Sequence, residues 1–157
     1  MKESINGDCY IYYDDDDGKR LVFCDYVNFL VNFAKEVYMS KRIIRFYNHH
    51  FNEFYLAQTE KVRKKILQTL VWIETLDIVP ITILRSIESV KGLYEIRVEF
   101  SSNIFRIFCC FDEGSLIVLF NGFQKKTQKT PSNEIEKAKR LMKEYFDSKN
   151  ENDEKQK

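Results

Sequence analysis

The stretch that decides the fold is Leu93-Tyr94-Glu95-Ile96-Arg97-Val98-Glu99-Phe100, followed by Ser101-Ser102-Asn103. Alternation divides the eight residues into an apolar set, namely Tyr94, Ile96, Val98 and Phe100, and a mostly charged set, namely Leu93, Glu95, Arg97 and Glu99. A period of two is typical of a β-strand with one buried face. The serines and asparagine predict a hairpin turn after it.

Two further strands follow this one. Residues 104–111 form an apolar run interrupted only by Arg106, and residues 116–123 form a third run after the turn segment 112–115. Short turns between the runs predict an antiparallel meander. Because strands two and three are almost continuously apolar, we expect them to be central and covered on at least one face.

Helical patterns flank the meander. Residues 51–77 repeat apolar side chains at spacings of three and four, with a possible break at Thr59 that would make a helical hairpin. Residues 43–47 are a short strand candidate. Residues 133–146 predict a closing helix, since Ser132 or Asn133 can cap it and Pro131 precedes it. The order of elements predicts an α+β fold.

The chain of 157 residues is long enough for one ordinary domain, and 44% of its residues are hydrophobic. We divide it into an extension at 1–38, a domain at 39–146 and a charged, disordered tail at 147–157. The extension holds four of the 25 basic residues and eight of the 24 acidic residues. The rest of the chain therefore carries the excess of positive charge.

Residues 1–38 allow two interpretations. Residues 9–24 resemble a β-hairpin around an Asp-Gly turn, and residues 26–38 have helical spacing, so the segment can be a real extension. Alternatively, Met39-Ser40-Lys41-Arg42 looks like a natural start, and the segment is an over-long reading frame. The sequence favours neither.

Arg97 and Arg106 are the most informative pair of charges. If Ser101 and Ser102 form a two-residue turn, the two arginines lie directly opposite each other on one sheet face, an unfavourable arrangement unless something uses or offsets it. Glu95 and Glu99 could neutralise them as a surface network. Alternatively, with Lys125 and Lys126 added from the next loop, the cluster is a phosphate site.

Other kinds of site lack support in the sequence. The four cysteines form no disulfide or zinc pattern, and adjacent Cys109 and Cys110 are expected to be packing residues. Adjacent His49 and His50 are a poor metal pair. We therefore expect no cofactor and no metal. No signal peptide or transmembrane stretch is evident, and a reducing cytoplasm is the expected compartment.

The residues from Gly92 to Arg97, Phe105-Arg106-Ile107, and Leu119 to Pro131 resemble the HigB-like, phage-derived branch of the RelE/ParE toxin superfamily. The resemblance covers about residues 41–146. It implies a RelE-like fold, in which a curved antiparallel sheet packs against an N-terminal helical hairpin, with a C-terminal helix. It also implies a type II toxin that cleaves mRNA in the ribosomal A site, with a helix-turn-helix antitoxin as partner.

By position, the resemblance makes Arg97, Arg106 and Lys126 the catalytic residues, with Glu95 orienting them. Residues expected to bind RNA phosphates are Lys125, Lys129, Lys61 and Lys64. Two departures concern the general base and acid: Glu95 stands where RelE has a lysine, and Thr130 and Pro131 stand where RelE has a tyrosine.

The expected reaction is a metal-free attack of a ribose 2′-oxygen on its own 3′-phosphate, with the cations stabilising the dianionic transition state. Two rival functions remain open at this point. The first is a ParE-like gyrase inhibitor with the same fold. The second is a non-catalytic phage remnant that only binds its antitoxin.

Overall fold

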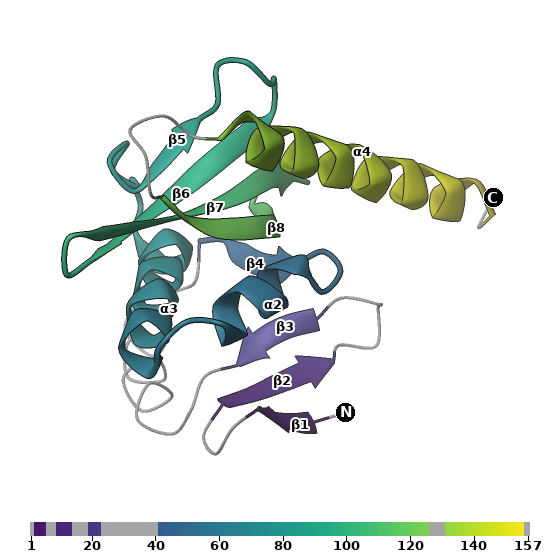
Figure 1. Cartoon of the computed structure of the whole chain (residues 1–157). Coiled ribbons are helices and arrows are strands. Elements are labelled where there is room, and N and C mark those ends of the chain that lie inside the picture. Colours follow the sequence, from purple (N-terminus) through teal and green to yellow (C-terminus); the bar gives the residue numbers. More distant parts are fainter. Residues whose placement is uncertain (1, 6–8, 14–18, 23–40, 126–130, 156–157) are drawn as a thin grey trace.

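A computed structural model describes residues 2–5, 9–13, 19–22, 41–125 and 131–155 (Figure 1). The described strands form one sheet in the order β1-β2-β3-β4-β8-β7-β6-β5. Their bounds are β1 Lys2–Ile5, β2 Cys9–Tyr13, β3 Lys19–Val22, β4 Ile43–Phe46, β5 Leu84–Ser86, β6 Leu93–Phe100, β7 Asn103–Asp112 and β8 Leu116–Lys125. The described residues also form three helices: α2 His50–Leu56, α3 Glu60–Thr75 and α4 Ser132–Lys155.

The meander of β6, β7 and β8 is antiparallel, as predicted, and the whole is an α+β fold. The antiparallel sheet that the resemblance implies is present only in part. The sheet is mixed, because β4 runs parallel to β8, from Ile43 opposite Leu116 to Phe46 opposite Leu119. The two helices between β4 and the meander allow this crossover. The short edge strand β5, which pairs with β6, was not predicted from the sequence.

The helices α2 and α3 cover one face of the sheet. They pack Phe51, Tyr55, Ile66 and Leu70 against sheet residues such as Ile96 and Ile107. The predicted break between them is confirmed, because α2 ends at Leu56 and Thr59 caps α3 by accepting a hydrogen bond from the Val62 amide.

The helix α4 covers the opposite face and extends past its predicted end at 146 to Lys155 (Figure 1). Its Ala138 and Leu141 pack against Leu93, Phe108 and Phe120. Cys109 belongs to the first core and Cys110 to the second, as their adjacency predicts. Burial raises the pKa of both thiols, so they remain protonated packing residues.

A polar clamp holds α4 to the sheet beyond residue 146. Asp112, at the end of β7, accepts hydrogen bonds from Tyr145 Oη at 2.7 Å and Lys149 Nζ at 2.8 Å. Lys149 also contacts Glu113. Burial raises the pKa of Asp112, but these hydrogen bonds outweigh it, and the pKa lies below its ordinary value. Because Lys149 lies past the predicted end of the helix, the clamp holds that part of α4 to the sheet.

A β-bulge interrupts the pairing of β7 with β8. Ile107 pairs with Gly122 and Cys109 pairs with Leu119, so Phe120 and Asn121 together lie opposite Phe108. Because side chains alternate along a strand, one extra residue moves every later side chain of β8 to the other face. Asn121 also donates a hydrogen bond to Glu134 of α4 at 3.0 Å.

The strands β1, β2 and β3 extend the sheet beyond β4. The hairpin predicted within residues 9–24 is present as β2 and β3, with Tyr10 opposite Val22. A single pair, Lys19 with Phe46, joins β3 to β4. The helix predicted at 26–38 lies outside the described residues. Among the described residues, no helix is long and apolar enough to span a membrane.

Gly122 offers a sharp test of the packing of α2 on the sheet. A Cβ atom at this position would lie 2.4 Å from the ring of Phe54, so the Gly122→Ala protein must shift α2 or the ring. We expect the free energy of unfolding to fall by about 1–3 kcal/mol, the usual cost of overpacking. Urea denaturation measures it. In a Phe54→Leu background, Gly122→Ala should lower the free energy of unfolding by less. An equal decrease in both backgrounds would contradict the proposed contact.

Asp112 should make stability depend on pH. Its pKa is lower in the folded protein, so its contribution is present above the unfolded pKa of about 4 and is lost as pH falls through the folded value. At pH 7 we expect Asp112→Asn to cost about 1–3 kcal/mol of unfolding free energy. Urea denaturation at pH 7 and pH 3 should show this difference shrinking at low pH. A constant difference would argue against the charged clamp.

Candidate functional site

Arg97 and Arg106 lie directly opposite each other on the sheet face that α4 covers in part. Phe100 pairs with Asn103, and the register places Arg97 against Arg106, as the two-residue turn predicts. Both turn serines have positive φ angles, 47° at Ser101 and 65° at Ser102. These angles are those of the tight turns that suit the twist of a hairpin.

Three rows of side chains cross the sheet at this place. Since directly paired residues of antiparallel strands point to the same face, each row lies on the α4 side. The rows are Arg85, Glu95 and Phe108; then Arg97, Arg106 and Phe123; then Glu99, Ile104 and Lys125. We call the four cations among them, Arg85, Arg97, Arg106 and Lys125, the basic site.

Glu95 is the buried centre of the basic site. Its side chain is 0% exposed, and its two oxygens contact Arg106 Nη1 and Arg85 Nε, the latter at 3.2 Å. The side chain of Arg106 is only 5% exposed. The predicted surface network of two glutamates is therefore correct for Glu99, which contacts Arg97 at the surface. Glu95 instead offsets the charge of Arg106 inside the protein.

The accessible cations of the site are Arg85, Arg97 and Lys125. The side chain of Arg85 is 52% exposed and that of Arg97 is 39% exposed. The sequence analysis did not predict Arg85 as a site residue, because it did not predict the strand β5. The stretch Ile83-Leu84-Arg85, shortly before a strand with which it could pair, was the available signal for β5. The buried Arg106 adds its positive charge to that of these three side chains.

Lys125 is electrostatically coupled to the three arginines. Desolvation lowers its pKa, and the charges of Arg106 and Arg97 lower it further, while Glu95 opposes them and Arg85 adds a smaller decrease. A lysine with a lowered pKa is closer to acting in proton transfer near neutral pH. The predicted proximity of Lys125 to the arginines is present in the structure.

The remaining predicted residues are placed differently. Lys126 and Lys129 lie outside the described residues. Lys61 and Lys64 lie on α3, which packs on the opposite face of the sheet, and Lys64 forms an ion pair with Glu60 at 2.7 Å. The structure therefore does not bring Lys61 and Lys64 to the basic site.

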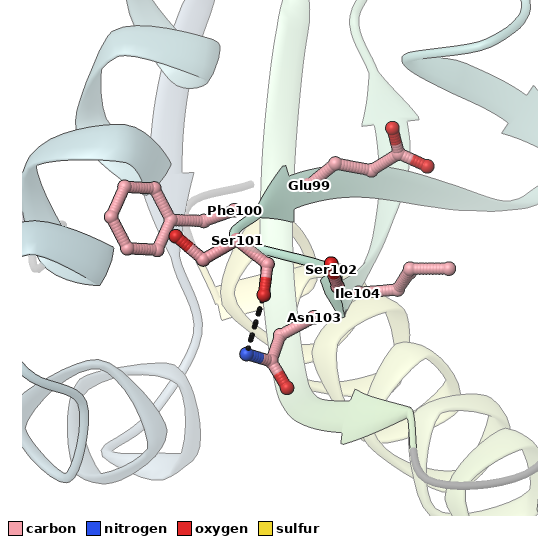
Figure 2. A pocket seen from close by; sticks show the side chains of 6 residues that line it. All are labelled: Glu99, Phe100, Ser101, Ser102, Asn103 and Ile104. Carbon is pink, nitrogen blue, oxygen red and sulfur yellow. Dashed lines mark hydrogen bonds between the residues drawn. The ribbon is translucent and has the colours of Figure 1, made fainter.

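A shallow pocket lies at the end of the β6–β7 hairpin, beside the third row (Figure 2). Figure 2 shows Phe100 pointing away from Glu99 and Ile104, consistent with alternation between the two faces. Asn103 donates a hydrogen bond to the Ser101 carbonyl at 3.2 Å and accepts one from Gln124 at 2.8 Å. These bonds fix the turn that sets the arginine register.

Within the part of the chain that the structure describes, one group could hold a metal ion. Ligand atoms of His49, His50 and Glu53 lie within 4.8 Å of one another at the start of α2. Desolvation lowers the pKa of His50, and the charge of Lys137 lowers it further, so its imidazole is mostly neutral at pH 7. The same positive charge opposes a bound cation, and the group lies apart from the rows of the basic site.

The model of the family described as Phage derived protein Gp49-like (DUF891) matches residues 53–143, more than half of the chain. The chain belongs to this Gp49-like family. The matched residues include all four cations of the basic site. The family is grouped with the toxins of toxin–antitoxin systems, which is consistent with a toxin-type function and suggests an antitoxin partner. No curated protein matches the chain.

Glu95 and Glu99 provide a matched pair for testing the charge balance. Glu95→Gln leaves Arg106 buried without its counter-ion, and we expect a loss of about 3–5 kcal/mol in unfolding free energy. Glu99→Gln removes an exposed partner and should cost less than about 1 kcal/mol. Chemical denaturation at pH 7 measures both.

A double variant checks the cause of this loss. Glu95→Leu with Arg106→Met replaces the buried pair by apolar side chains, and it should recover most of the stability that Glu95→Gln loses. If the double variant is the less stable of the two, the loss does not come from an uncompensated arginine.

Proposed function

We propose that this Gp49-like protein is the toxin of a type II toxin–antitoxin system and that it cleaves mRNA in the ribosomal A site. The observation that carries the proposal is the basic site, in which Arg97 and Arg106 face each other beside a lysine with a lowered pKa. Membership of a toxin-type family supports it.

The arrangement suits a phosphate group that gains negative charge during a reaction. Arg97 Nε and Arg106 Nε have no hydrogen-bond acceptor within the described residues. Two facing guanidinium groups repel each other, and an anion bound over this sheet face would relieve the repulsion. In the transition state of 2′-oxygen attack, the phosphate carries additional charge, which fixed cations stabilise more than they stabilise the ground state.

Each accessible residue has a proposed role. Arg97 contacts the scissile phosphate, and Lys125 contacts a phosphate oxygen or transfers a proton, which its lowered pKa favours. Arg106, held by Glu95, supplies fixed charge below them. Lys126 remains a proposed catalytic residue and Lys129 a proposed phosphate contact. Lys61 and Lys64 would act only at a separate surface, towards ribosomal RNA.

Cleavage of an mRNA bound to purified ribosomes tests the proposal. We expect cleavage by the wild-type protein to leave a 2′,3′-cyclic phosphate or 3′-phosphate, and a single 2′-deoxynucleotide at the cut position should abolish it. Arg97→Gln and Lys125→Gln should each lower the single-turnover rate, by roughly 100- to 1,000-fold for Arg97. Lys139→Gln, which removes an exposed cation of α4, is the control and should keep full activity.

The same assay distinguishes the rival functions. Inhibition of gyrase with intact transcripts would identify a ParE-like inhibitor and contradict the nuclease. Binding to a helix-turn-helix antitoxin, with no effect of the toxin on transcripts or on growth, would identify a non-catalytic remnant. Folded Arg97→Gln and Lys125→Gln proteins with unchanged cleavage would show that the chemistry lies elsewhere.

A further inference from the structure

Phe123 completes the row of Arg97 and Arg106, and nothing in the proposed chemistry uses it. It lies directly opposite Arg106, on the same sheet face. Its ring stacks on the buried ring of Phe108, with centroids 5.8 Å apart and planes inclined by 28°. Unlike Phe108, Phe123 keeps part of its surface exposed.

The surroundings of Phe123 are unusual for an exposed aromatic ring. Lys125 follows it by two residues on the same face, and Arg97 lies two strands away in its row. Ile104, which pairs with Lys125 and is also partly exposed, is the diagonal neighbour of Phe123. An apolar surface thus lies within the basic site, at the edge of the core that α4 covers.

We propose that Phe123 is a stacking platform for one unpaired base of the RNA strand whose phosphates contact Arg97 and Lys125. This inference rests on the proposed function and specifies its substrate as single-stranded RNA. Proteins that bind single strands combine cations for the backbone with aromatic rings for the bases, because a base has an apolar face that water solvates poorly. The stacked Phe108 holds the Phe123 ring in place, which reduces the entropy lost on binding.

The bulge in β8 supports this assignment. Without the extra residue, alternation from Phe120 would send Phe123 and Lys125 to the face that α2 and α3 cover. The same irregularity that brings the lysine to the arginines therefore also brings the ring. Phe123 and Lys125 are two residues apart on β8, so they lie on the same face of the sheet.

Binding of a 2′-O-methylated hexauridylate, which resists cleavage, tests the proposal with the full-length protein. We expect Phe123→Leu to weaken binding about 10- to 100-fold, while Phe123→Tyr stays within about threefold of the wild type. The salt dependence of binding should stay unchanged in Phe123→Leu, since no phosphate contact is lost. In Lys125→Gln the slope of log affinity against log salt should fall by about one.

A second ligand makes the test independent of how well Phe123→Leu folds. An oligomer of the same length without bases keeps every phosphate, and wild-type protein should bind it about 10- to 100-fold more weakly than the hexauridylate. Phe123→Leu should bind both equally. Equal binding of both ligands by the wild type, or wild-type affinity in a folded Phe123→Leu protein, would overturn the stacking role alone. No binding of either oligomer by the wild type would also overturn the stacking role, whereas the proposed function fails only if the wild type leaves mRNA on purified ribosomes intact.

Discussion

One extra residue in β8 is the constraint on which the basic site depends. Two residues of β8, Phe120 and Asn121, lie opposite the single residue Phe108 of β7. Up to Phe120 the strand builds the core under α4, and after Asn121 it delivers Phe123 and Lys125 to the same face. Asn121 is itself held by Glu134 of α4, so the helix that closes the core also fixes the irregularity. Core and site are therefore two uses of one strand face.

The buried carboxylate of Glu95 determines how much of the positive charge is available. It contacts the buried Arg106 and the more exposed Arg85, which leaves Arg97 and Lys125 without a contact to this carboxylate. A site of four uncompensated cations would repel itself and unfold the sheet edge. With Glu95 inside, the repulsion is limited and the guanidinium of Arg106 is fixed in position. Positioning and stability are in this way supplied by the same ion pair.

The sequence predicted the elements whose signals are local. Alternation in residues 93–100 and the Ser101-Ser102 turn were sufficient for the Arg97–Arg106 register, and Thr59 marked the break between α2 and α3. What it could not predict depends on contacts between distant residues. The parallel pairing of β4 leaves no local pattern, β5 is only three residues long, and the burial of Glu95 needs two other strands. Asn121-Gly122 was a readable sign of the bulge, since glycine inside a strand often marks one.

The parallel contact of β4 with β8 also affects how the protein is made. The pairing of β4 with β8 joins Ile43 to Leu116, which lies far along the chain. Closing so long a loop is slow, so this pairing cannot form early. During synthesis, the chain emerges from its N-terminus, so Arg97 and Arg106 leave the ribosome before the strand that completes their surroundings. Lys125 lies on β8, so it can join Arg97 and Arg106 only after that later strand is translated. The basic site is therefore complete only once the sheet has assembled across β7 and β8.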